Sequence, residues 1–351
     1  MMVRGLAGTL LLALLITARV AAAENKPEAV LKSLAPEDVL AVLDLSSPGL
    51  EEARAAADKG DRAEALAALL KHYRKQFPAN TPEATLSSKT RHTADDIVNH
   101  VFQWGPYEPA EYCKDVNWEA DPRGDIEWVA AMYRFHWAEP LAEAYGHTKD
   151  EKYAQAFVDL SSDWIAKHPL EKADRVHPIY AHWKGFAWLD IQTGRRARSL
   201  CRAFPSLLHS QAFTPEFLGM LLASLYDHQV KTEAAPRAPA HNKAVFEQRG
   251  FVEVATAFPE FKDSRRWLEL ALERTRISLM SQTTEDGVQR EWATGYHRGV
   301  LEDAVWVFQK VEKAGIPIPQ DCRDRTRRMA DCLFAVATPD LGYPMFGDAG
   351  R

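Results

Sequence analysis

The chain has 351 residues, of which 46% are hydrophobic and 26% are charged, and its formal net charge is −6. This mildly acidic balance argues against general nucleic-acid binding, although a basic cleft for an anionic glycan can form in an acidic protein. The four cysteines have no metal-ligand spacing: Cys113, Cys201, Cys322 and Cys332. We therefore expect neither a metal site nor a cofactor.

The first residues have the pattern of a secretory signal peptide. Arg4 precedes the short apolar run 5–17, and the small residues 21–23 predict cleavage after Ala23, with an uncleaved anchor as the alternative. The run is too short for a permanent membrane helix, and no later segment is apolar enough to span a membrane. We expect a periplasmic or secreted protein, in which disulfides are possible but are not assigned by the sequence.

Helical periodicity dominates the rest of the chain, and the alternation typical of strands is nearly absent. Thr214 followed by Pro215 is typical of a helix start. Such helices, joined by short turns, predict an all-α fold, in which stacked hairpins or an ordinary multi-helix domain would bury the apolar faces. The segments with helical spacing are 50–77, 125–145, 150–168, 217–230, 258–280, 297–314 and 321–337.

Two short segments carry most of the candidate chemistry. The first is 241–247, which contains Asn242, and the second runs from an Asp-Gly turn at 286–287 through Glu291 to Tyr296. A phenol can exchange protons if its pKa falls well below about 10. A lone Asn in a loop is commonly a turn residue, and a Tyr-His pair before a helix commonly serves packing, so only the two segments together indicate function.

In this order and within these helices, the two segments resemble the heparinase II/III-like polysaccharide lyases, both heparinase III-like and alginate lyase-like. The resemblance implies the N-terminal portion of that fold, an incomplete (α/α) toroid of helical hairpins over residues 24–340. Residues 341–351 would begin the connection to a β-sandwich domain that is mostly absent here and is expected in the full-length protein. Other matching segments are 125–128, 134–137, 141–145, 149–154, 188–196 and 258–262.

The reaction of that family is β-elimination at a uronic acid, which requires a neutralised carboxylate, a base for the C5 proton and an acid for the departing O4. By resemblance, Asn242 neutralises the carboxylate, and Tyr296 is the general acid and with some substrates also the base. The remaining base of the family is a His in the β-sandwich. We expect an anionic polysaccharide of the heparan sulfate or heparin type as the substrate, with alginate or oligo-alginate as the alternative.

Four neighbours of these candidates are predicted to support them: His241, Glu247, Glu291 and His297. Glu247 follows Asn242 by five residues and Glu291 precedes Tyr296 by five, so each carboxylate is predicted to orient its own partner. Four residues on the inner face are predicted to bind the glycan, with a bidentate contact from the last of them to a carboxylate or sulfate: Arg134, His136, Trp137 and Arg195.

Two other functional classes stay open. Glycoside hydrolases also use helical toroids and need two carboxylates, about 6.5–9.5 Å apart for inversion. Glu247, Glu291 and Asp286 are the candidates for that pair. A non-catalytic, glycan-binding fragment is the third hypothesis. Product analysis separates the two enzymes, because hydrolysis adds water whereas elimination leaves a conjugated double bond.

Overall fold

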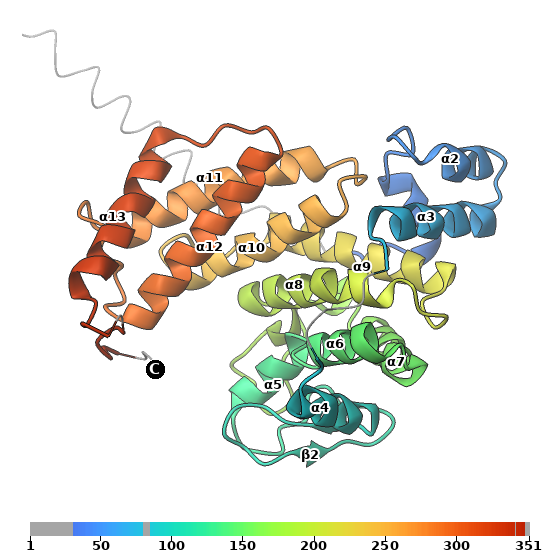
Figure 1. Ribbon diagram of the computed structural model, residues 1–351, viewed down its shortest axis with the longest axis horizontal. Helices are drawn as coiled ribbons and strands as arrows, with labels where there is room; N and C mark the ends of the chain where they lie inside the picture. Colours follow the sequence, from blue (N-terminus) through green and yellow to red (C-terminus); the bar gives the residue numbers. More distant parts are fainter. Residues whose placement is uncertain (1–30, 80–84, 341, 348–351) are drawn as a thin grey trace, which may run out of the picture. The chain divides into compact units, whose positions relative to one another are not determined.

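The computed structural model describes residues 31–79, 85–340 and 342–347, and the described residues from Lys32 onward belong to one compact unit. The chain is mostly helical, with 62% helix and 3% strand, which confirms the all-α prediction (Figure 1). The expected signal peptide lies outside the described residues, as do Leu341 and 348–351 of the expected connection. Among the residues described, no helix is long and apolar enough to cross a membrane.

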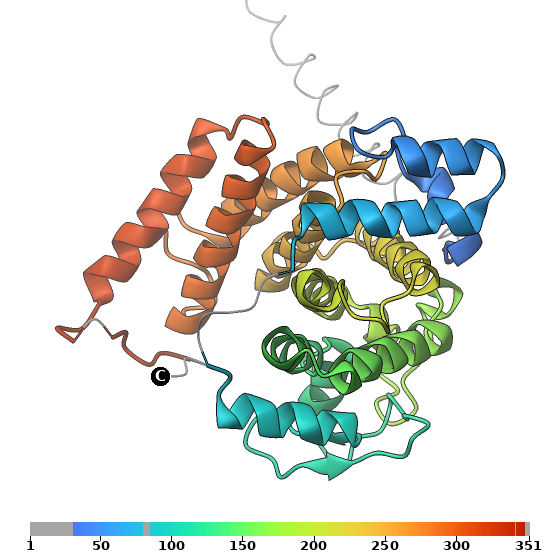
Figure 2. The ribbon, with the colours of Figure 1, turned by 45° about the vertical axis from the view of Figure 1, so that its right-hand side comes forward.

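Most elements of the described residues are helices, and two short strands lie among them. The helices are η1 (Pro36–Val42), α2 (Glu51–Asp58), α3 (Arg62–Gln76), α4 (Ser88–Val98), α5 (Ile126–Tyr133), α6 (Ala138–Thr148), α7 (Glu151–Lys167), η2 (Leu170–Lys172), η3 (Phe186–Trp188), α8 (Asp190–Leu207), α9 (Pro215–Ala234), α10 (Asn242–Ala257), α11 (Ser264–Gln282), α12 (Thr294–Lys313) and α13 (Gln320–Val336). The strands are β1 (Val101–Phe102) and β2 (Ala110–Glu111), which pair antiparallel. Both ribbon views place α8 and α9 between α10–α13 on one side and α4–α7 on the other (Figures 1 and 2).

Three expected helical segments differ from the observed helices. The segment 50–77 forms two helices, because Gly60 adopts a positive φ of 77° and the Asp61 side chain caps the next helix at Glu64. The segment 125–145 is also divided, since Phe135 has a φ of 57° between α5 and α6. The expected helix 258–280 begins only at Ser264, after a turn. The cap at Thr214 is confirmed, because its side chain accepts a hydrogen bond from the Phe217 amide.

Helices α8 and α10 approach each other closely at two glycines. A Cβ atom added to Gly250 would lie 2.1 Å from the carbonyl oxygen of Gly194, and one added to Gly194 would lie 2.9 Å from the Cα of Glu247. Neither position has room for a side chain, so glycine at both allows the two backbones to touch. This crossing fixes Arg195 of α8 against the first turns of α10.

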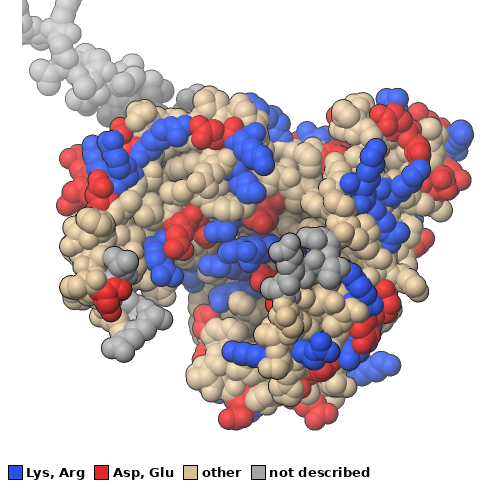
Figure 3. Space-filling view, in the orientation of Figure 1, with Lys and Arg blue, Asp and Glu red and all other residues tan. Residues whose placement is uncertain are grey.

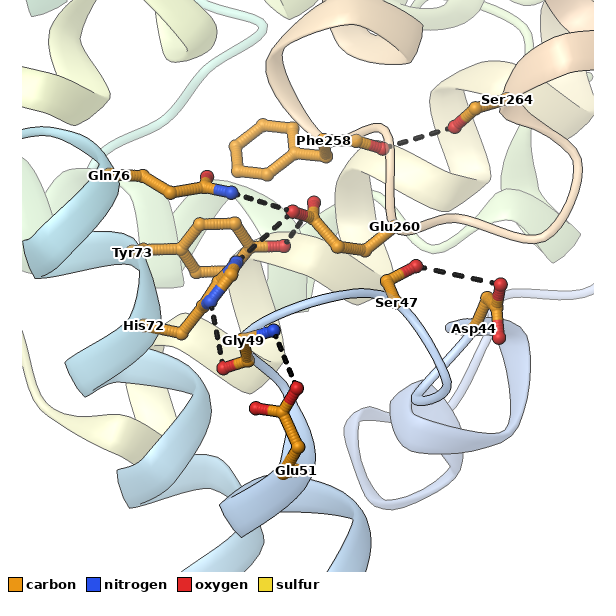
Figure 4. A network of polar contacts seen from close by, with 10 residues as sticks. All are labelled: Asp44, Ser47, Gly49, Glu51, His72, Tyr73, Gln76, Phe258, Glu260 and Ser264. Carbon is orange, nitrogen blue, oxygen red and sulfur yellow. Dashed lines mark hydrogen bonds and ion pairs between the residues drawn. The ribbon is translucent and has the colours of Figure 1, made fainter.

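The buried carboxylate of Glu260 links the N-terminal hairpin, which consists of α2 and α3, to the turn between α10 and α11 (Figure 4). Glu260 is 3% exposed and accepts hydrogen bonds from the Tyr73 hydroxyl at 3.1 Å and from Gln76 Nε2 at 3.1 Å. His72 Nε2 lies 3.2 Å from the same carboxylate, and its Nδ1 lies 3.0 Å from the carbonyl oxygen of Gly49. Because several donors of α3 converge on this one group, α3 is held to the connector that follows α10.

The four cysteines are free thiols: Cys113, Cys201, Cys322 and Cys332. The last two both lie in α13. A straight helix holds residues ten apart at about 15 Å, which is too far for a disulfide.

Candidate functional site

The amide of Asn242 is oriented by Glu291. Asn242 is the first residue of α10 and is 8% exposed. Its Nδ2 donates a hydrogen bond of 2.9 Å to Glu291 Oε2 in the loop before α12. A carboxylate only accepts hydrogen bonds, so this contact identifies the nitrogen of the amide and leaves its second N–H available.

A chain of buried polar groups holds the two loops that carry Asn242 and Glu291. Gln289 Oε1 accepts from the Glu291 amide at 2.8 Å, and Gln289 Nε2 donates to Gln282 Oε1 at 3.3 Å. Gln282 Nε2 lies 3.4 Å from the carbonyl oxygen of His241. These contacts tie the residue before Asn242 to the loop of Glu291 through α11.

His297 supports the same chain from the other end. It is 6% exposed, its Nδ1 accepts from the Gln289 amide at 3.4 Å, and its Nε2 lies 2.9 Å from the carbonyl oxygen of Met329 in α13. These partners require a neutral ring that is protonated on Nε2, and burial lowers the pKa of His297. The structure therefore gives His297 a structural role beside Tyr296, whereas the His241 side chain is exposed.

Asn242 and Tyr296 lie on facing sides of α10 and α12. Phe246 is one turn after Asn242, and Gly299 is three residues after Tyr296, so each pair shares a helix face. A Cβ added to Gly299 would lie 3.4 Å from the Phe246 ring, which shows that these two faces pack together. Tyr296 itself is half-buried in the first turn of α12.

Glu247 does not take the role expected for it. It is 1% exposed, and its Oε2 accepts a hydrogen bond of 3.0 Å from the backbone amide of Arg237. Burial raises the pKa of Glu247 to about 7. The prediction that Glu247 orients Asn242 is thus corrected, because Glu291 holds that amide while Glu247 holds the preceding loop.

A basic hollow lies between residues of α4, α6 and α8. Its volume is about 590 Å³, and its lining includes Lys89, Arg134, His136, Glu139, Glu143, Arg195, Arg198 and Arg202. Figure 3 shows Lys and Arg side chains grouped in the hollowed middle of the face that it views. Three of the four predicted glycan-binding residues therefore line one hollow.

The cations of the hollow differ in how they are held. Arg134 donates to Glu127 at 2.9 Å and to Gln192 Oε1 at 3.3 and 3.2 Å, so protein groups occupy its fork. Arg195 lies 5.3 Å from the Phe246 ring centroid and, among the described residues, has no ion pair. The surrounding protein desolvates His136 and, with nearby Arg134 and Arg195, lowers its pKa to about 4. Arg195 is therefore freer than Arg134 to meet an anionic group.

The prediction that Trp137 binds the glycan is wrong. Its side chain is 3% exposed, and its ring packs against Phe135 at 4.5 Å and against Trp118 and Phe157 at 6.0 Å. A ring enclosed in this way has no face to offer a sugar. Trp137 therefore belongs to the core.

Residues 39–351 match the family described as Heparinase II/III N-terminus. The chain belongs to this family. It is 30% identical over 321 residues to a heparin-sulfate lyase of Pedobacter heparinus, and 29% identical over 330 residues to one of Bacteroides stercoris.

These heparinase II/III relatives are longer than the chain. The two matches cover 88% and 89% of this chain but 48% and 49% of the relatives, so the chain spans about half of their length. The solved structure of the heparan sulfate lyase HepC from Pedobacter heparinus is similar with a TM-score of 0.74 at 28% identity. That match covers 89% of this chain and 50% of the other. The observed helices therefore correspond to the N-terminal toroid portion of the family.

Two tryptophans of this heparinase II/III chain were missed by the sequence-based predictions. Trp292, next to Glu291, is 74% exposed and has a φ of 54°, which is uncommon for a residue with a side chain. Trp183 lies beside Lys243, the residue that follows Asn242. The position of Trp292 directly after Glu291 could have indicated it from the sequence. Only the fold brings Trp183 close to Lys243.

Metal ligands do not gather in the described part of the chain. No three His, Cys, Asp or Glu side chains of those residues lie where they could hold an ion.

Proposed function

We propose that the chain is the helical part of a polysaccharide lyase that cleaves a uronic-acid-containing glycosaminoglycan by β-elimination. The observation that carries this proposal is the Asn242–Glu291 hydrogen bond on the side of α10 that faces Tyr296. The family supports it, because the relatives are named heparin-sulfate lyases.

Asn242 neutralises the uronate carboxylate. One N–H of its amide is used by Glu291, and the other donates to the substrate carboxylate. This bond strengthens as negative charge moves from C5 onto the carboxylate in the transition state, as in an oxyanion site. The pinned amide does not have to reorient during the reaction, which is the advantage of a preorganised donor.

Tyr296 transfers the proton to the leaving group. A base takes the C5 proton, the C5–H electron pair becomes the C4–C5 double bond, and the C4–O4 bond breaks. Tyr296 gives its proton to O4. The base is Tyr296 itself or a His of the C-terminal domain expected in the full-length protein.

The basic hollow selects an anionic polymer. Arg195 meets a carboxylate or sulfate, and Arg134 and His136 complete the wall around it. A heparan sulfate or heparin chain suits these cations. Such a substrate fits an exported protein, periplasmic or secreted, as the segment 1–23 predicts.

The hydrolase alternative loses one of its carboxylates. Glu247 is 1% exposed and is held by the loop at Arg237, so it does not reach a glycosidic bond. Glu291 is committed to Asn242. Two of the three candidate carboxylates are therefore engaged by protein groups, and an inverting pair would need Asp286 together with one of them.

The test is an ultraviolet assay for unsaturated uronic products on heparan sulfate, heparin, hyaluronan and alginate. It uses the chain and any longer form that its source encodes. We expect Tyr296→Phe and Asn242→Ala each to lower kcat at least about 100-fold. Tyr226→Phe is the matched control, because this half-buried phenol packs on Phe261 and Trp267 away from α12.

Two results would refute the proposal. Full activity in Tyr296→Phe would remove the proton donor from the mechanism. Products that have gained water and show no conjugated absorbance would identify a hydrolase instead.

A further inference from the structure

The segment between η2 and η3 forms a closed loop. Val176 pairs with Lys184 across it, and the Gly185 amide donates to the carbonyl oxygen of Arg175 at 2.9 Å. Gly185 has a φ of 69°, and a Cβ there would lie 2.6 Å from the carbonyl oxygen of Ala173. The loop therefore depends on glycine for its closure.

Internal hydrogen bonds fix the shape of this loop. His177 is 3% exposed, and its Nδ1 accepts from the amides of Ile179 at 3.2 Å and Tyr180 at 3.1 Å. The His177 amide donates to the carbonyl oxygen of Trp183 at 3.3 Å, and the Trp183 amide donates to that of Tyr180 at 2.8 Å. The Tyr180 hydroxyl also donates to Asp121. Trp183 is thus held in place before any ligand arrives, which reduces the entropy lost on binding.

Trp183 brings an aromatic surface to the first turn of α10. It is half-buried, and its ring packs on Phe186 at 5.4 Å and on His182 at 5.7 Å. Lys243 Nζ lies 5.9 Å from the centroid of its ring. Lys243 directly follows Asn242, so the indole lies beside the helical turn that begins with the residue proposed to hold the uronate.

Lys243 is available for an anion. Within the described part of the chain it forms no ion pair, and its cation–π contact is close to the outer limit of about 6 Å. An ammonium group is a compact point charge suited to sulfate and phosphate. An indole offers a large, flat apolar surface to the C–H face of a pyranose ring.

We propose that Trp183 and Lys243 form a sugar subsite directly beside Asn242, which stacks the hexosamine next to the cleaved uronate and binds one of its sulfate groups. This subsite rests on the proposed function, because Asn242 marks where the uronate lies. The subsite would favour sulfated glycans, because a polymer of uronates without sulfate offers no sulfate group to Lys243.

The experiment measures binding to the full chain by isothermal titration calorimetry. The probes are a sulfated heparin octasaccharide and an unsulfated octasaccharide of glucuronate and N-acetylglucosamine. We expect Trp183→Ala to weaken both probes about fivefold or more, and Trp183→Phe to restore part of that loss. We expect Lys243→Met to weaken only the sulfated probe, by about threefold at low salt, and to flatten its salt dependence.

Matched controls separate the subsite from general damage. Ile179→Ala removes an apolar side chain of the same loop that is 55% exposed. Lys75→Met removes an exposed lysine of α3. Both should bind the two probes like the parent chain, and unchanged thermal midpoints would show that every variant is folded. If Trp183→Ala does not fold, Trp183→Phe and Lys243→Met carry the test.

Three results would overturn the subsite. These are unchanged binding in Trp183→Ala, equal weakening of both probes in Lys243→Met, and no binding of either probe by the parent chain. Because binding requires no bond cleavage, the two proposals fail separately. A chain that binds as expected but makes no unsaturated product overturns the lyase alone, and a cleaving chain with unaffected variants overturns the subsite alone.

Discussion

Burial of Glu247 makes the stability of the protein depend on pH in a defined direction. The side chain is 1% exposed, and desolvation raises its pKa from 4.5 to about 7. We consider the substitution Glu247→Gln, which keeps the size of the side chain and an oxygen acceptor for the Arg237 amide. The variant removes the ionisation and leaves the local hydrogen bond in place.

The magnitude follows from the shift in pKa. Each unit of difference between the folded and unfolded states is worth about 1.4 kcal/mol. A change from 4.5 to about 7 therefore corresponds to roughly 3 kcal/mol of unfolding free energy.

The sign comes from proton binding. Between these two pH values the folded chain keeps the proton of Glu247 while the unfolded chain has lost it. The free energy of unfolding of the parent chain therefore falls as pH rises through this window. Below the window both states are protonated and no penalty applies; above it the penalty is complete and constant.

Urea unfolding of the parent chain and of Glu247→Gln, followed by circular dichroism from pH 4.5 to 8.5, measures this difference. We expect the variant to be more stable by roughly 3 kcal/mol at pH 8 and nearly equal at pH 4.5. Asp227, whose pKa burial raises to about 7, contributes equally to both proteins and cancels. A difference that does not change with pH, or that grows toward acid, would refute the reasoning.

Three further predictions concern positioning and packing. Glu291→Ala should release the amide of Asn242 and lower kcat roughly tenfold or more, with a smaller change in KM. Glu291→Gln keeps an acceptor for that amide and should recover part of the rate. Equal kcat values in the two variants would contradict this role. Gly250→Ala should lower the free energy of unfolding by about 1–3 kcal/mol or more, because the new Cβ clashes with α8. Gly219→Ala is the control, since its Cβ would meet Leu66 at an ordinary 3.4 Å and should leave the stability unchanged. Thermal denaturation measures both. Glu260→Ala should cost about 1–3 kcal/mol in the same assay, because it leaves the buried hydroxyl of Tyr73 without its acceptor, and a loss well below 1 kcal/mol would show that the network is unimportant.

The sequence alone was sufficient for the fold class and for the two motif segments. Helical periodicity persists along the chain, and local signals such as the Thr214 cap and the Asp-Gly turn act within a few residues. The turn is present, since Gly287 has a φ of 92°. Breaks within periodic segments were harder to predict, because Phe135 adopts a positive φ that nothing in its residue type requires.

The partner of Asn242 could be assigned only from the tertiary structure. Residues five apart in a helix that turns about 100° per residue point about 140° away from each other, so Glu247 lies on the other side of α10 from Asn242. The carboxylate that reaches the amide belongs to Glu291, 49 residues later, in a loop placed by the packing of α11 and α12. The tertiary structure also decides that Trp137 is enclosed by other side chains and that Trp183 approaches Lys243. Periodicity predicts which face of a helix is apolar, but the side chains that meet across helices depend on where those helices cross, as at the two glycines of α8 and α10.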